Sequence, residues 1–331
     1  MSTLTRRWQF PNLIIEGRWT GAALGERWAA TFAARPAADG APDLHVMLDQ
    51  VDNVPPAPPG EPHFQQGDLL AYYLDGPDHA TAHFPRYGQV RLNLSTGSSE
   101  GALTEAALAA HGVFEDLLAI SLSPHLRRRG LFLLHAFAAC PPEGGGAALI
   151  VGDIGVGKTT TGLALLHAGW KLLSNDSPMV AEAAGGVRVL AYPGLLSAYP
   201  DTLARFPELA ALNTAPAVRE KVLFAAEAAY PDVWAEAAPA RAIIFPQVEP
   251  RPDHALEPLP PARALRLILP HAIEQWDRAM IPGHLRLLNR LVQAAPAYRL
   301  RLGPDTTTLP DVIGGEINHK GTKAQRDAKG A

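Results

Sequence analysis

The stretch that decides the fold is Gly152-Asp153-Ile154-Gly155-Val156-Gly157-Lys158-Thr159. It fits the phosphate-binding pattern G-x-x-x-x-G-K-[ST]. The apolar segment 147–151 ends directly before it, and the spacing of apolar residues predicts a helix from about Lys158 to Ala168. Glycines let successive backbone N–H groups turn inward around an anion, and the start of a helix adds partial positive charge. The sequence therefore predicts a loop that binds the phosphates of a nucleotide.

Individual residues of this loop have expected roles. Lys158 is expected to reach the β- and γ-phosphates, and the Thr159 hydroxyl is expected to bind Mg²⁺. ATP and Mg²⁺ are thus the expected cofactors. The residues expected to contact the nucleotide are Gly152, Asp153, Gly155, Val156, Gly157, Lys158, Thr159 and Thr160. The loop does not identify a reaction, because GTPases, motor ATPases, small-molecule kinases and transport ATPases share it.

A second apolar strand ends in polar residues shortly after the loop, in Leu172-Leu173-Ser174-Asn175-Asp176. A carboxylate at the C-terminal end of a neighbouring strand would lie near the phosphates. The alternative is an ordinary Ser-Asn-Asp turn. Beside a phosphate loop, the functional interpretation is the stronger one.

Together with Leu134-His135-Ala136, these segments resemble HPr kinase/phosphorylase and its relatives, which include kinases encoded with some lasso-peptide pathways. The resemblance covers about residues 131–195. It implies an α/β P-loop kinase domain with a fold like that of phosphoenolpyruvate carboxykinase, preceded by a smaller β-rich N-terminal unit. The downstream glycine-rich signature of HPr kinase/phosphorylases has no match here, which favours a kinase-like relative over an HPr-modifying enzyme.

The resemblance also assigns candidate catalytic residues: His135, Asn175, Asp176 and Lys158. It places His135 near the transferred phosphate and makes Thr159 and Asp176 the candidate metal ligands. The family's paired aspartates fall on Asn175 and Asp176, and the first of the pair is the general base in the family. An amide cannot take a proton from a hydroxyl near neutral pH. Three outcomes remain open: Asp176 is the base or a metal ligand, His135 takes the proton, or the protein binds nucleotide without efficient transfer.

The expected function is that of an ATP-dependent serine kinase-like protein. It would transfer the γ-phosphate to a hydroxyl of a peptide, a carrier protein or a small molecule. The alternatives are a nucleotide-binding scaffold or regulator without transfer activity, and a nucleotide hydrolase. Arg219-Glu220-Lys221 either supplies a cation near the γ-phosphate or forms a solvated charge cluster. The family analogy suggests a possible homo-oligomer.

Composition limits the other classes of function. The chain has 331 residues, of which 47% are hydrophobic and 19% charged, with a net charge of −4. This is a globular composition without a global field that would attract nucleic acid. The single cysteine, Cys140, excludes an internal disulfide framework and is expected to be a small buried hydrophobe. We find no apolar stretch long enough to span a bilayer and no secretory h-region, so we expect a cytoplasmic protein without a membrane partner.

The pattern of segments predicts three regions: a β-rich unit over 1–102, the P-loop domain over 103–315 and a disordered polar tail over 316–331. A helix over 114–126 is expected to kink or end at Pro124, and Arg127-Arg128-Arg129 is expected to be its solvated end, with phosphate binding as the alternative. Further expected strands cover 131–140 as one run, 242–245 and 265–269.

Overall fold

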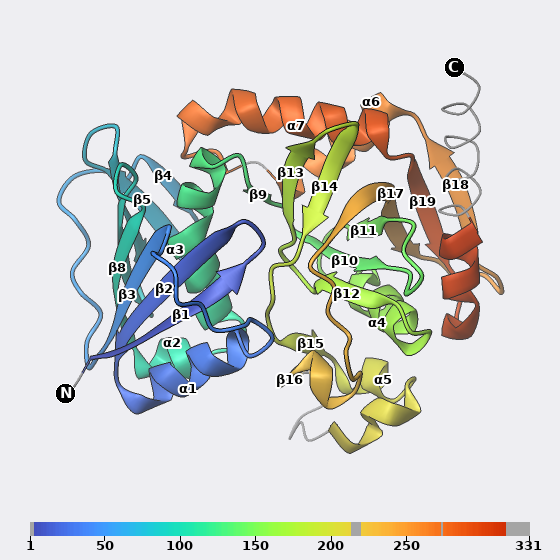
Figure 1. Ribbon diagram of the computed structural model, residues 1–331, viewed down its shortest axis with the longest axis horizontal. Helices are drawn as coiled ribbons and strands as arrows, with labels where there is room; N and C mark the ends of the chain where they lie inside the picture. The colour runs from blue at the N-terminus through green and yellow to red at the C-terminus, as the bar shows by residue number, and fades with distance from the viewer. Residues whose placement is uncertain (1–2, 213–219, 273, 316–331) are drawn as a thin grey trace. The chain divides into compact units, whose positions relative to one another are not determined.

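The computed structural model describes residues 3–212, 220–272 and 274–315, and the chain forms two units (Figure 1). Unit 1 comprises Met1–Leu131 and Glu274–Ile281, and unit 2 comprises Phe132–Ile273 and Pro282–Ala331. The division falls after Leu131 instead of after residue 102, because two further helices pack on the sheet of unit 1. The tail expected to be disordered, 316–331, lies outside the described residues, as does Arg219.

Unit 1 is built on a mixed sheet with the strand order β1-β2-β3-β8-β7-β6-β5-β4. Its strands are β1 (Leu4–Phe10), β2 (Leu13–Thr20), β3 (Leu44–Val51), β4 (Phe64–Gln66), β5 (Leu70–Leu74), β6 (His79–Phe84), β7 (Gly88–Asn93) and β8 (Ser98–Thr104). Strands β2 and β3 pair in parallel, as do β3 and β8. A parallel pair needs a crossover, and α1 (Ala22–Thr31) supplies it between β2 and β3.

An aromatic cluster forms part of the core of unit 1. Trp8 and Trp28 are fully buried and stack with their ring centroids 5.7 Å apart. A Cβ atom on Gly17 would lie 2.7 Å from each of these rings, so only glycine fits on β2 at this point. The region expected to be β-rich carries strands of this sheet, and its aromatic side chains bury apolar surface that stabilises the unit.

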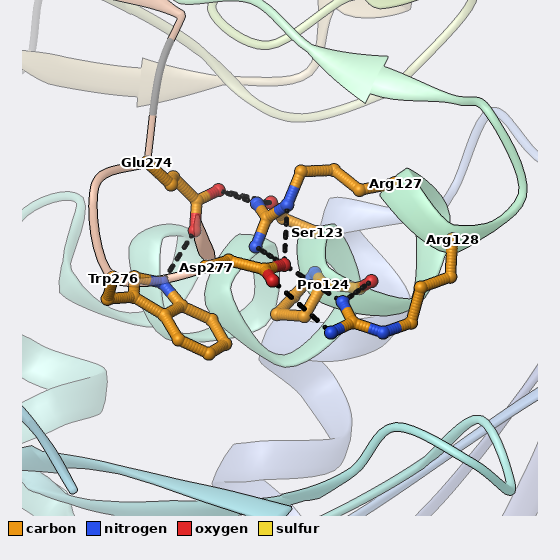
Figure 2. A network of polar contacts seen from close by, with 7 residues as sticks. All are labelled: Ser123, Pro124, Arg127, Arg128, Glu274, Trp276 and Asp277. Atoms are coloured by element: carbon orange, nitrogen blue, oxygen red, sulfur yellow. Dashed lines mark hydrogen bonds and ion pairs between the residues drawn. The ribbon is translucent and has the colours of Figure 1, made fainter. Parts of the chain in front are cut away.

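The helices α2 (Glu105–Ala109) and α3 (Val113–Arg128) complete unit 1. Helix α3 runs through Pro124 without ending there. The expectation of a solvated arginine end is wrong for Arg127, whose side chain is only 3% exposed. Figure 2 shows why: Arg127 and Arg128 both bind the carboxylate of Asp277, with N–O distances of 2.9 Å and 2.8 Å.

Further contacts extend this cluster, which we call the arginine cluster: Ser123, Arg127, Arg128, Glu274 and Asp277 (Figure 2). Glu274 contacts Arg127 and Ser123. Burial alone would raise the pKa of Asp277, but hydrogen bonding to Arg128 and the charge of Arg127 hold that pKa below its ordinary value. The cluster thus fixes the segment Glu274–Ile281 to α3, far from it in sequence.

Unit 2 contains a second mixed sheet, in the order β12-β10-β11-β17-β14-β13-β9, with β19 beside β17 and β18 beside β19. Its strands are β9 (Phe132–Leu133), β10 (Ala136–Cys140), β11 (Ala147–Val151), β12 (Lys171–Ser174), β13 (Met179–Ala183), β14 (Gly186–Leu190), β17 (Ala237–Val248), β18 (Ala255–Leu259) and β19 (Ala297–Leu302). Strand β11 pairs in parallel with β17, and β17 in parallel with β19. A small sheet pairs β15 (Leu196–Ala198) with β16 (Val222–Phe224).

The helices of unit 2 include α4 (Lys158–His167), α5 (Pro200–Leu203), α6 (Pro261–Ile268) and, from its second residue onward, α7 (Ile281–Ala294), and residues 309–315 are also helical. Helix α4 packs on β10 and β11. The predicted strand over 265–269 is wrong, because Ala264 and Ile268 are four residues apart and bury one face of α6. The predicted run over 131–140 is interrupted after Leu133, which leaves His135 outside both β9 and β10. Cys140 is buried as expected.

None of the described helices is both long and apolar enough to cross a membrane.

Candidate functional site

The phosphate loop joins the buried strand β11 to α4 (Figure 1), as the sequence predicts for these elements. Gly155 and Gly157 have φ angles of 86° and 103°, in the left-handed region that glycine adopts without strain. A Cβ atom on Gly157 would lie 2.4 Å from Cδ1 of Leu302, so a side chain here would collide with β19. Glycine-rich backbone at the start of a helix has the chemistry to bind an anion.

The side chain of Lys158 folds back onto its own loop. Its Nζ donates hydrogen bonds to the carbonyl oxygens of Gly152 and Asp153, the latter at 3.0 Å. Burial lowers the pKa of Lys158, the charges of Asp176 and Asp153 act to raise it, and Lys221 lowers it further. Lys158 thus lies within electrostatic range of two carboxylates and a second cation.

Lys221 is the part of the predicted basic cluster that the structure brings to the loop. It influences the charge state of Lys158, and its Nζ lies 5.3 Å from the ring centroid of Tyr199. A cation above an aromatic face is held in place without being neutralised. Lys221 therefore places a second positive charge within electrostatic range of Lys158.

His135 and Asp176 lie side by side next to the loop. The Nδ1 atom of His135 is 3.2 Å from Oδ1 of Asp176, and the side chains are 40% and 49% exposed. The break between β9 and β10 allows this, because the backbone N–H of Ala136 donates to the carbonyl oxygen of Asp176 at 2.9 Å. The turn after β12 is thereby tied to the residue that follows His135. The structure brings together the two residues that the sequence singled out.

The side chain of Asn175 forms a hydrogen bond with the backbone. Its Nδ2 donates to the carbonyl oxygen of Leu195 at 2.8 Å. Gly194 lies against the other end of the amide, because a Cβ atom there would be 3.3 Å from Oδ1 of Asn175. Asn175 therefore fixes the segment after β14 through an N–H that an aspartate would not have.

His271 is a residue of the site that sequence reasoning missed. It ends a 3₁₀ turn, Leu269–His271, and its carbonyl oxygen accepts a hydrogen bond from the backbone N–H of His135 at 2.8 Å. Its Nε2 lies 3.9 Å from Oδ1 of Asp153, and the ring centroids of His271 and His135 are 6.1 Å apart. The side chain is 12% exposed. No motif marks His271, and the strand expected just before it gave the wrong local context.

Burial lowers the pKa of His271. The charge of Asp153 acts against this shift, while His135 and Lys158 add to it. The imidazole is therefore uncharged near neutral pH. An anion bound between these groups would change that balance.

A cavity of about 380 Å³ opens beside the start of α4. Its lining consists of Gly157, Thr160, Arg205, Val248, Glu249, Pro250, Arg251, Leu302, Gly303, Pro304, Thr306 and Leu309. Val248 offers an apolar surface, with 65% of it exposed. Thr160, expected from the sequence to contact nucleotide, lines this cavity.

Within the described residues, no cluster of three or more His, Cys, Asp or Glu side chains could hold a metal by itself. Mg²⁺ bound with a nucleotide does not need such a cluster, since it takes one or two carboxylates with phosphate oxygens and water. Thr159 and the half-exposed Asp176 have the oxygen chemistry for this. These residues therefore suit Mg²⁺ only when phosphate oxygens supply further ligands.

Comparison with known proteins does not identify a family for this chain. None of the protein-family models and none of the curated proteins matches the chain. Among solved structures, the chain is similar to the Hpr(Ser) kinase/phosphatase from Coxiella burnetii, with 12% sequence identity, a TM-score of 0.31, and coverage of 58% of this chain and 98% of that one. At this level the likeness decides neither family nor activity.

Proposed function

We propose that the protein is an ATP-dependent kinase that transfers the γ-phosphate to a hydroxyl group of a peptide, a carrier protein or a small molecule. The observation that carries this proposal is the His135–Asp176 pair, in which Nδ1 of the imidazole lies 3.2 Å from Oδ1 of the carboxylate. The pair lies beside the phosphate loop, because the charge of Asp176 acts on the pKa of Lys158. A loop alone supports binding. A base next to the loop supports transfer.

The geometry of the pair favours His135 as the base. Nδ1 lies 3.2 Å from the carboxylate of Asp176, so a proton on Nδ1 would face Asp176 and leave Nε2 as an acceptor. A carboxylate that orients an imidazole in this way also stabilises the imidazolium that forms when a proton is taken. His135 would accept the proton of the substrate hydroxyl at Nε2 as the hydroxyl oxygen bonds to the γ-phosphorus. The bond between that phosphorus and the β–γ bridging oxygen would break, and ADP would leave.

The remaining groups would each bind a different part of the nucleotide. The loop N–H groups and Lys158 would bind the β- and γ-phosphates, and Lys221 would offset their charge. Thr159 and Asp176 would hold Mg²⁺, which supplies charge neutralisation on the transferred group. The cavity beside Thr160 is large enough for a nucleoside, with Val248 and Leu302 as apolar walls for the base.

One observation favours a second candidate, a nucleotide-binding regulator without transfer activity. Asn175 stands where the kinases that the sequence resembles have their base, and its amide Nδ2 donates a hydrogen bond to the carbonyl oxygen of Leu195. If His135 did not act as a base, the loop and the cavity would still bind nucleotide.

The test is acceptor-dependent release of ADP from ATP·Mg²⁺, with serine-containing peptides, small carrier proteins and small alcohols as candidate acceptors. We expect His135→Gln to lower the rate by about 10²–10⁴-fold and to leave ATP affinity within a factor of three. The matched control is His167→Gln, because His167 is exposed at the opposite end of α4.

Transfer that is unchanged in His135→Gln would remove His135 as the base. ATP binding without acceptor-dependent turnover across the panel would replace the kinase by the regulator. Equal ADP release with and without acceptor would identify a hydrolase.

A further inference from the structure

His271 is a largely buried side chain at the phosphate loop to which the reaction above assigns no part. This side chain is 12% exposed and lies within electrostatic range of a lysine, Lys158, and a carboxylate, Asp153. Its distance of 3.9 Å from Asp153 is too long for a hydrogen bond. Asp153 is 87% exposed, so its carboxylate is free to move away from the ring.

A backbone hydrogen bond ties His271 to the residue next to the proposed reaction centre. The carbonyl oxygen of His271 is held by the N–H of His135, and the turn that carries it is one 3₁₀ turn long. The two rings face each other at an interplanar angle of 25°. His271 therefore stands on the same side of the loop as the His135–Asp176 pair, where the proposed reaction places the transferred phosphate.

We propose that His271 binds the terminal phosphate of a nucleoside triphosphate and so makes the site prefer a triphosphate over a diphosphate. This inference rests on the proposed function in one respect, namely that the phosphates occupy the loop Gly152–Thr159. The class of ligand is a nucleoside triphosphate with Mg²⁺. His271 is a specificity residue and takes no proton from the acceptor.

The charges around His271 predict that binding of the triphosphate is coupled to proton uptake. In the free site burial opposes a proton on the ring, Asp153 favours one, and His135 and Lys158 also oppose it. The negative charges of a terminal phosphate would add to the effect of Asp153, so the ring would take up a proton when the triphosphate binds. Affinity for ATP would then rise as the pH falls, and affinity for ADP would change less.

The experiment is titration calorimetry of the full chain with ATP·Mg²⁺ and with ADP·Mg²⁺. We expect His271→Gln to weaken ATP binding roughly tenfold or more and to leave ADP binding within a factor of two, because only the terminal phosphate loses a charge-assisted hydrogen bond. Lys158→Ala should weaken the binding of both nucleotides. His167→Gln should weaken neither.

A second measurement uses only the unaltered protein. Titration in two buffers that differ in ionisation enthalpy reports the number of protons taken up, and we expect uptake with ATP that exceeds uptake with ADP. An equal loss of ATP and ADP affinity in His271→Gln, or equal proton uptake with the two nucleotides, would overturn the role of His271.

The two proposals fail separately. ATP preference that depends on His271, in a protein that never phosphorylates an acceptor, would sustain the role of His271 and end the kinase proposal. Binding of neither nucleotide to the unaltered protein would end both.

Discussion

Asn175 shows how one atom decides whether a residue serves chemistry or structure. Its Nδ2 donates to Leu195, and its Oδ1 lies against Gly194. An aspartate would place an oxygen where a donor is needed, opposite a carbonyl oxygen. The same substitution that the resemblance to kinases suggests as a restoration of the base therefore removes a hydrogen bond.

We expect Asn175→Asp to lower the free energy of unfolding by about 1–3 kcal/mol, the cost of leaving a polar group without its partner. Urea unfolding at neutral pH checks this. Asn93→Asp is the matched control, because Oδ1 of Asn93 accepts from Ser95 and Thr96 and an aspartate oxygen can do the same. A gain in phosphoryl transfer with unchanged stability would show instead that Asn175 is a base lost in this chain.

At the scale of elements, α3 holds a titratable group inside unit 1. His125 is 1% exposed, and its Nε2 lies 2.9 Å from the hydroxyl of Ser99. Burial, followed by the charges of Arg128, Arg129 and Arg127, lowers the pKa of His125 to about 4. The folded state therefore holds this ring neutral, and unfolding allows it to take up a proton below pH about 6.5.

The sign of the resulting pH dependence follows from this lowered pKa. The contribution of His125 to stability is fully present above pH about 6.5 and is lost as the pH falls towards the folded-state pKa. We expect the loss to reach about 2 kcal/mol at pH 5. Urea unfolding at pH 7.5 and pH 5 measures it. His125→Gln should show a smaller loss between the two pH values, and an equal loss would contradict the assignment.

The arginine cluster gives a second prediction for α3. Asp277→Asn leaves the buried guanidinium of Arg127 with less of its compensating charge, so we expect unit 1 to lose about 3–5 kcal/mol of stability. Denaturant unfolding checks this, with Asp78→Asn as a control at an exposed carboxylate of the same unit. A loss below about 1 kcal/mol would show that water or Glu274 compensates for Asp277.

These elements also show what the sequence could predict. The phosphate loop, α4 and β12 follow from local patterns, because glycine spacing and apolar periodicity act over a few residues. The burial of Arg127 could not be predicted, since its partner Asp277 is 150 residues away in sequence. His271 was missed for the same reason: its neighbours Asp153 and His135 come from distant segments.

At the scale of the whole molecule, each of the two units is built from two separate segments of the chain. The chain of unit 2 is interrupted by Glu274–Ile281, which belongs to unit 1. The phosphate loop, the cavity, His135, Asp176 and His271 all lie in unit 2. Nucleotide binding should therefore act on the stability of unit 2.

We expect scanning calorimetry to resolve two transitions, because chains of more than one compact unit depart from a single two-state transition. ATP·Mg²⁺ at about one hundred times its dissociation constant should stabilise unit 2 by about 2.7 kcal/mol and raise one transition only. Asp277→Asn should lower the other. A single transition that both changes move together would show that the units unfold as one.

The central claim is that nucleotide phosphates bind to Gly152–Thr159 through Lys158, and calorimetric titration of ATP·Mg²⁺ tests it most directly. Lys158→Ala removes a charge-assisted contact worth about 1.5–3 kcal/mol, so affinity should fall roughly tenfold or more. Lys171→Ala is the matched control, because Lys171 lies on β12 and its Nζ donates to the carbonyl oxygen of Asp232. Loss of affinity in Lys158→Ala alone is the predicted result, and equal ATP affinity in Lys158→Ala and the unaltered protein would contradict the account.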